Sequence, residues 1–225
     1  MTPTPRLSRR GLLAAAAALP LAGCNATRLL DAGRPPNLYT LTPAREFSAG
    51  LPRVPWQLLV ETPLSNTAIN TTRIALGQDG NRITYFADAN WIDTAPEMVQ
   101  LLLVESLENS NRIVAVGIEA SGLRSDFVLK TDLRDFAADY GAGAPGTGIP
   151  AAMVRINAKL VRMPRRTIVA SDTFEAQVPA AGPNFAQVIQ AFDTALETVL
   201  RRVVEWTLRQ GAANTDLDPL ATASR

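Results

Sequence analysis

Three successive stretches between residues 126 and 178 alternate apolar with polar residues, and this alternation constrains the fold more than any other feature of the sequence. Side chains of a β-strand point alternately to its two faces, so each stretch predicts a strand with one buried and one solvated face. The apolar sets include Phe127, Leu129, Thr131 and Leu133 in the first stretch and Val154, Ile156, Ala158 and Leu160 in the second. The third stretch follows a turn at Pro164. Three consecutive half-exposed strands predict an antiparallel meander.

Shorter strand signals precede this meander. Residues 37–41, "NLYTL", alternate in the same way, and Trp56–Glu61 is an apolar run of strand length. Residues 72–76 and 82–86 flank the turn sequence "GQDGN" and predict a β-hairpin. Residues 112–118, "RIVAVGI", add a further strand signal before the meander begins.

The first of two helices is predicted over residues 93–111. Asp93 or Thr94 supplies its amino-terminal cap. Pro96 and Glu97 suit the first turn, where a missing N–H costs nothing and the helix dipole favours a carboxylate. The predicted apolar face comprises Met98, Leu101, Leu102 and Leu107, widened by Val99, Leu103 and Val104. So broad a face indicates a heavily buried helix.

The second helix is predicted over residues 184–210. Its apolar stripe comprises Phe185, Val188, Ile189, Phe192, Leu196, Val199, Leu200 and Val203. Glu197 with Arg201, and Glu205 with Arg209, have the i,i+4 spacing of helix-stabilising ion pairs. We interpret the stripe as core. The alternative is a surface for a partner helix, with Trp206 as an exposed anchor.

Composition places these elements in one globular domain. The chain has 225 residues, 47% of them hydrophobic, which is enough for a sizeable single core. We therefore predict an α/β fold: a single compact domain with a mixed, largely antiparallel sheet and two main helices. The formal net charge is +1, so no strong field favours nucleic acid. Histidine is absent, which weakens most hydrolase and metal-site hypotheses, and we expect no cofactor and no metal.

The first 23 residues have the three parts of a secretory signal. Arg6, Arg9 and Arg10 give a positive start, a short apolar stretch follows, and small residues lead up to Cys24. The apolar stretch is shorter than the roughly 20 residues that a membrane-spanning helix needs. The segment "SRRGLL" is also typical of twin-arginine export, so the export route stays open between the two systems.

The sequence "LAGC" explains why the chain has a single cysteine. Leu21, Ala22 and Gly23 followed by Cys24 resemble the bacterial lipobox, in which a dedicated peptidase cleaves before a cysteine that receives a lipid. Several acyl chains on one terminus give stable membrane anchoring. The alternative is a lone buried thiol. Loss of three arginines with the signal leaves 19 basic and 21 acidic residues, a charge of −2, so the lipid anchor rather than charge must hold the protein to a membrane.

The expected domain organisation follows from these segments. Residues 1–23 are the signal peptide, and residues 24–37 are the lipidated cysteine and a flexible tether with two prolines that stop any helix. Residues 38–210 form the folded domain. Residues 211–225 lack any periodic pattern and are predicted to be a disordered tail.

The order and spacing of these stretches resemble the ABC-type transport auxiliary lipoprotein family, which includes the PqiC lipoprotein and lipoproteins associated with Mce-type lipid transporters. The matching stretches are "LYTL", "RITYFADANWIDTAPEMVQLLLVESLE", "FVLKTDLRDFAADYG", "VRINAKLVRMPRRTIVASDTFEAQVP" and "VIQAFDTALETVLRRVVEW". The resemblance implies a fold similar to the amino-terminal domain of the TolB translocation protein. It implies a non-catalytic role beside a lipid transporter whose Mce-domain, permease and ATPase components are separate chains, and it is compatible with a homo-oligomer. The family offers no catalytic residues to carry over.

Four further features could be interpreted as functional sites: a glycine-rich loop, three aspartates, a tryptophan and a serine. The stretch 141–148, "GAGAPGTG", lacks the lysine of a phosphate-binding loop and is better interpreted as a hairpin loop. Asp132, Asp135 and Asp139 lack the ligand spacing of a calcium loop and are interpreted as a solvated strand end. Trp91 either packs in the core, which we favour, or lines a lipid groove. Ser121 has no histidine to activate it as a nucleophile.

Two functional hypotheses result. The preferred one is a lipoprotein on the periplasmic face of the Gram-negative envelope that serves as an auxiliary component of an Mce-type lipid transporter. Asn25 after the lipidated cysteine favours the outer over the inner membrane, by resemblance to enteric lipoproteins. The alternative is a lipid-binding periplasmic carrier or receptor. An enzyme is the weakest class.

Overall fold

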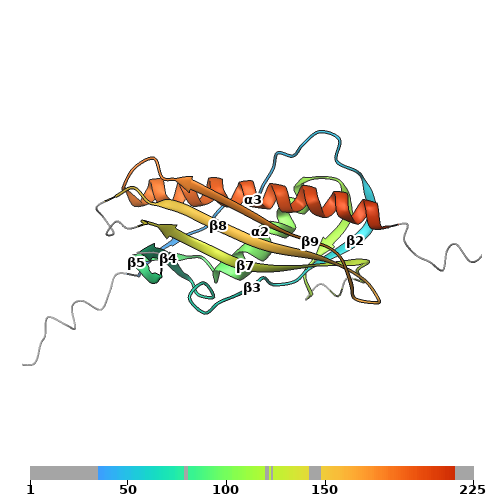
Figure 1. The fold of residues 1–225 in the computed structure, drawn as a ribbon, viewed down its shortest axis with the longest axis horizontal. Helices are drawn as coiled ribbons and strands as arrows, with labels where there is room; N and C mark the ends of the chain where they lie inside the picture. Colours follow the sequence, from blue (N-terminus) through green and yellow to red (C-terminus); the bar gives the residue numbers. More distant parts are fainter. Residues whose placement is uncertain (1–34, 79–80, 120–121, 123, 142–147, 216–225) are drawn as a thin grey trace, which may run out of the picture. The chain divides into compact units, whose positions relative to one another are not determined.

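The computed structural model describes residues 35–78, 81–119, 122, 124–141 and 148–215. Within them, nine strands in one mixed sheet and two helices form a single α/β domain, which confirms the predicted fold class (Figure 1). The strands are β1 (Asn37–Tyr39), β2 (Val54–Val60), β3 (Leu64–Ser65), β4 (Arg73–Gln78), β5 (Arg82–Trp91), β6 (Ile113–Gly117), β7 (Phe127–Asp139), β8 (Ala151–Arg162) and β9 (Thr167–Pro179). The helices are α2 (Ala95–Asn109) and α3 (Phe185–Asn214).

The antiparallel meander is confirmed. β8 pairs antiparallel with β7 on one side and with β9 on the other, so that Leu133, Ile156 and Phe174 lie side by side across the three strands. Alternate residues of β8 from Val154 to Leu160 are fully buried, as their spacing predicts. The predicted hairpin also forms, with β4 and β5 antiparallel.

β7 holds the rest of the sheet together. One of its edges pairs with β8, and the other pairs in succession with β2, β3 and β4, all three parallel to it. β6 extends the sheet beyond β2, and β5 and β1 extend it beyond β4. The two-residue strand β3 was not predicted. The long ladders of β7 with β8 and of β8 with β9 are thus antiparallel, and the three shorter ladders along the other edge of β7 are parallel.

Both helices pack on one face of the sheet. α3 lies against β7, β8, β9 and β2, while α2 lies against β2, β6 and α3. Between helix and sheet, Trp91, Phe136 and Phe192 form an aromatic cluster with ring centroids 5.3–5.4 Å apart. Trp91 is only 1% exposed, which confirms that it packs in the core. We call the opposite face, which carries side chains such as Lys130 and Lys159, the open face.

The helices differ from the predictions in two places. Leu101 is 53% exposed, so its assignment to the apolar face of α2 was wrong. It lies on the opposite side of the helix from Leu103, which is fully buried, because successive helical residues turn by about 100°. α3 continues to Asn214, four residues beyond its predicted end at residue 210. Gly211 lies in this extension and packs against Trp56.

Residues 41–51, which we call the strap, cross both helices. The backbone N–H of Thr42 donates to Asp193 of α3 (2.7 Å), and that of Ala44 donates to the Ser106 hydroxyl of α2 (2.9 Å). Leu41, Ala44 and Leu51 of the strap are themselves buried in the core. Strap, helices and sheet therefore form three layers.

Candidate functional site

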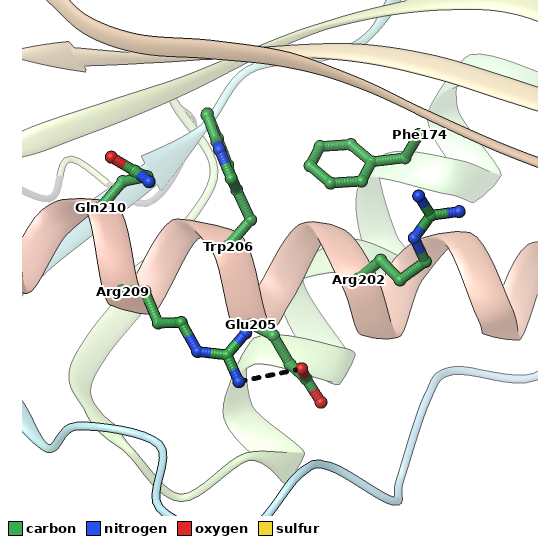
Figure 2. A pocket seen from close by; sticks show the side chains of 6 residues that line it. All are labelled: Phe174, Arg202, Glu205, Trp206, Arg209 and Gln210. Atoms are coloured by element: carbon green, nitrogen blue, oxygen red, sulfur yellow. Dashed lines mark hydrogen bonds and ion pairs between the residues drawn. The ribbon is translucent and has the colours of Figure 1, made fainter.

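A surface groove of about 250 Å³ lies between the carboxyl-terminal half of α3 and the edge strand β9 (Figure 2). We call it the α3–β9 groove. It is lined by Phe174, Arg202, Glu205, Trp206, Arg209 and Gln210.

Helical spacing and strand alternation bring these side chains together. Arg202, Trp206 and Gln210 follow each other at intervals of four residues and form one ridge on α3. Phe174 points from β9 toward the helix and is 5% exposed. Its ring meets Trp206 edge to face, with centroids 5.7 Å apart at 68°. The apolar part of the groove is therefore a fixed aromatic pair.

Arg202 links the groove to the edge of the sheet. Its guanidinium lies 5.6 Å from the centre of the Phe174 ring and donates a 2.9 Å hydrogen bond to the Glu175 carbonyl. Among the described residues, β9 pairs only with β8, so its other edge presents backbone groups outward. Arg202 covers part of this edge, a common way to limit uncontrolled strand pairing.

Glu205 supplies a fixed negative charge beside the groove. Burial raises the pKa of its carboxyl, but hydrogen bonds from Ser48 and the charge and hydrogen bond of Arg209 outweigh burial, so that the pKa lies below its usual value. The Ser48 N–H donates at 2.7 Å and Arg209 at 3.3 Å, which confirms the predicted Glu205–Arg209 pair. The predicted pair of Glu197 with Arg201 does not form within the described part of the chain.

The chemistry of the groove suits contact rather than bond making. Arginine and tryptophan packed around a buried aromatic ring are the residue types that contribute most to protein–protein binding. A general acid at neutral pH needs a raised pKa, whereas Glu205 is held ionised by fixed donors. The groove therefore offers a rigid aromatic surface with two guanidinium groups for a partner.

The three aspartates of β7 do not act together. Asp132 lies 3.3 Å from Lys159, Asp135 lies 2.5 Å from Arg155, and Asp139 accepts a hydrogen bond from the Gly141 N–H at 2.9 Å. Each carboxylate has its own partner on the open face, in agreement with the strand interpretation. Among the described residues, no three acidic, cysteine or histidine side chains lie together in a way that could hold a metal.

Several predicted residues lie outside the described residues. They are Cys24, the motif residues Leu21, Ala22 and Gly23, Ser121, most of the 141–148 loop, and the tail from residue 216 onward. Lipidation of Cys24 therefore stays a prediction. In the part of the chain that is described, neither helix is both long and apolar enough to cross a bilayer.

Half of the residues that line the groove were singled out from the sequence, namely Trp206 and the Glu205–Arg209 pair. Phe174, Arg202 and Gln210 were missed. The four-residue spacing of Arg202 from Trp206 was a usable signal. The approach of Phe174, more than 25 residues away in the sequence, depends on how β9 packs beneath α3 and has no local signal.

Fold and groove together define a class: a one-domain α/β protein with an open mixed sheet and a contact groove at its edge. Residues 39–204 match the model of the family described as "ABC-type transport auxiliary lipoprotein component". The chain belongs to this family. Auxiliary components of this kind are generally non-catalytic parts of transport systems, and a lipoprotein family indicates anchoring to a membrane of the cell envelope.

Relatives support the family at the level of sequence and fold. The crystal structure of protein XCC0632 from Xanthomonas campestris is 32% identical, with a TM-score of 0.74 over 80% of this chain and 98% of that one. A crystal structure of an uncharacterized protein shares the fold at 12% identity, with a TM-score of 0.59 over 77% of this chain and 99% of that one. The uncharacterized protein bll6063 from Bradyrhizobium diazoefficiens is 29% identical over 153 residues. That match covers 67% of this chain but only 39% of the relative's length.

Proposed function

We propose that this protein is a periplasm-facing lipoprotein that serves as a non-catalytic auxiliary component of an Mce-type ABC lipid transporter in the Gram-negative envelope. The observation that carries the proposal is the family match over residues 39–204. The α3–β9 groove is the surface that we assign to the transporter partner, because its aromatic pair and Arg202 have the composition of a protein contact.

Membrane attachment belongs to the same proposal. Residues 1–23 are removed as a signal peptide, Cys24 carries the lipid, and residues 24–37 tether the domain. The outer membrane is favoured by Asn25, and export by either route is compatible with the signal. Mce-domain, permease and ATPase chains are the proposed partners.

The alternative, a lipid-binding carrier, has less support. A carrier that shields a whole lipid needs a cavity, and ligand cavities commonly enclose about 300 to 1,000 Å³. A lipid groove near Trp91 was the alternative to core packing. The space beside Trp91 is filled by Phe136 and Phe192. Among the described residues, two surface pockets enclose about 250 Å³ each.

A crosslinking pull-down from envelopes tests the proposal, with the full-length protein and a Cys24→Ala variant. We expect Mce-domain or permease chains, identified by mass spectrometry, to be captured by the lipidated protein and lost with Cys24→Ala. Arg202→Ala is expected to reduce capture, since it removes a groove side chain that is itself exposed. Arg201→Ala is the matched control, because Arg201 precedes it on α3 but does not line the groove. Capture of lipid alone would favour the carrier, and unchanged transport after loss of membrane association would contradict the auxiliary role.

A further inference from the structure

A row of apolar side chains crosses the open face where four strands lie side by side. Leu59 of β2 pairs with Val128 of β7, Val128 with Val161 of β8, and Val161 with Ile168 of β9. Cross-strand partners lie on the same face of a sheet. The row is therefore continuous, although the rest of this face carries mainly polar and charged side chains.

A groove of about 250 Å³ follows this row. Val128 and Val161 are only 6% and 4% exposed, although they point away from the helices, whereas Ile168 is 56% exposed. Lining side chains are Val128, Val161, Met163, Ile168 and the charged Glu61, Lys130 and Arg166. The groove thus combines an apolar floor with a charged rim, in which Glu61 pairs with Lys130 and Arg166 adds a positive charge.

Two of the three cations in this region have no ion-pair partner among the described residues. The third, Lys130, lies 2.5 Å from Glu61 and forms an ion pair. Arg165 and Arg166, in the turn between β8 and β9, are exposed and form no ion pair with any residue that the structure describes. Although the formal charge of the mature chain is −2, the positive charge beside the apolar row is therefore available locally to an external anion.

The backbone at Arg166 is unfavourable for arginine. Its φ of 55° lies in the left-handed region, which glycine and asparagine occupy with less strain. Folding alone would be served better by one of those residues. An arginine at such a position indicates a use for its side chain.

We infer that the groove and the β8–β9 turn form a contact site for anionic phospholipid headgroups at a bilayer surface. The guanidinium groups of Arg165 and Arg166 suit the phosphate, which accepts paired N–H donors. The row of Val128, Val161 and Ile168 takes the apolar carbons next to the headgroup. A groove of about 250 Å³ cannot enclose the acyl chains, so these stay in the bilayer.

The site lies within reach of a membrane-anchored amino terminus, and in this respect the inference rests on the proposed lipidation of Cys24. Residues 24–36 span roughly 40 Å when extended. The domain begins at Asn37 of β1, which pairs with β5, and β5 pairs with β4. Ala75 of β4 pairs with Ala137 of β7, which lies nine residues from Val128, or roughly 30 Å along the strand. A single bilayer can therefore hold the anchor and contact the groove.

Vesicle sedimentation tests the site on the mature chain with Cys24→Ser, which cannot be lipidated. Vesicles of phosphatidylcholine are compared with vesicles in which about one third of the lipid is phosphatidylglycerol. We expect binding to the anionic vesicles and about thirtyfold weaker binding when Arg165→Gln is combined with Arg166→Asn. Asparagine suits the backbone at this position, so the variant should fold. Ile168→Thr keeps a β-branched residue and should also weaken binding.

The matched control combines Arg45→Gln with Arg82→Gln, which removes two exposed arginines from other parts of the domain. Its binding should equal that of the parent chain. Equal binding to both vesicle types, or an equal loss in the control, would overturn the inference. Dihexanoylphosphatidylglycerol should displace the vesicles, whereas displacement by the same concentration of inorganic phosphate would overturn it in favour of a free-phosphate site. Because Cys24 is replaced throughout and no transporter is present, failure here is separate from failure of the proposed function.

Discussion

Gly211 shows how closely the carboxyl-terminal end of α3 is packed. A Cβ atom at this position would lie 2.2 Å from Cζ2 of Trp56, far inside van der Waals contact. Trp56 has little room to move, because it is 3% exposed and meets Phe127 edge to face at 5.0 Å. Glycine is therefore required here by space rather than by backbone conformation.

Gly211→Ala should lower the free energy of unfolding. Overpacking of a core costs about 1–3 kcal/mol, and the better helix propensity of alanine returns at most about 1 kcal/mol. Urea denaturation measures the difference. Gly148→Ala is the control, since a Cβ there meets nothing within 4 Å. A Gly211→Ala protein as stable as the parent would mean that the Trp56 side chain can shift at little cost in free energy.

Glu205 should make the stability depend on pH in the acidic range. The pKa of Glu205 is lowered in the folded protein, so its ionised carboxylate adds to the free energy of unfolding. This stabilisation is fully present above the ordinary carboxyl pKa of 4.5 and is lost as the pH falls through the lower pKa of the folded state. Glu205→Gln should remove this dependence and cost about 1–2 kcal/mol at neutral pH, because a charge-assisted acceptor for Ser48 and Arg209 is lost.

Unfolding by urea at a series of pH values between neutral and acidic conditions checks this prediction. Glu197→Gln is the control on the same helix, since Glu197 has no ion pair within the described residues, and it should change stability by less than about 0.5 kcal/mol. Identical pH profiles for the parent and Glu205→Gln would refute the assignment.

At the scale of elements, the strap depends on a few side chains of the helices. Asp193 accepts the backbone N–H of Thr42 at 2.7 Å and its hydroxyl at 2.9 Å. Asp193→Ala should therefore raise the rate of amide hydrogen exchange across residues 41–51 about tenfold, while the β8 amides keep their protection. Thr194→Ala, a change of the neighbouring exposed residue, should leave the strap unaffected. Exchange that rises equally in strap and sheet would show that the two unfold together.

Elements with a strong local period could be predicted from the sequence, and elements without one could not. β7, β8 and β9 carry long alternations, and α3 carries a long apolar stripe, so their types and faces were recovered. β3 has only two residues and therefore no period to detect. Leu101 was misassigned because it is an apolar residue on the polar side of α2, where Glu97, Glu105 and Glu108 lie four residues before it and four and seven residues after it.

At the scale of the whole domain, the pairing of distant segments was beyond sequence reasoning. Nothing in the short strands β2, β3 and β4 indicates that all three pair with β7 in parallel, since each pairing is decided by packing far along the chain. The two grooves also form through the packing of segments that are far apart in the sequence. Only the assembled sheet brings Phe174 to Trp206 and aligns Leu59, Val128, Val161 and Ile168 in one row across four strands.

The strap also has a mechanical consequence. Any tension that reaches Asn37 along the chain is borne first by β1, whose ladder with β5 is three residues long, and then by the hydrogen bonds between Thr42 and Asp193. The long ladders of β7 with β8 and of β8 with β9 lie beyond these weaker links. Under a load applied at Asn37, the domain should therefore lengthen by releasing β1 and the strap, while the sheet keeps its shape.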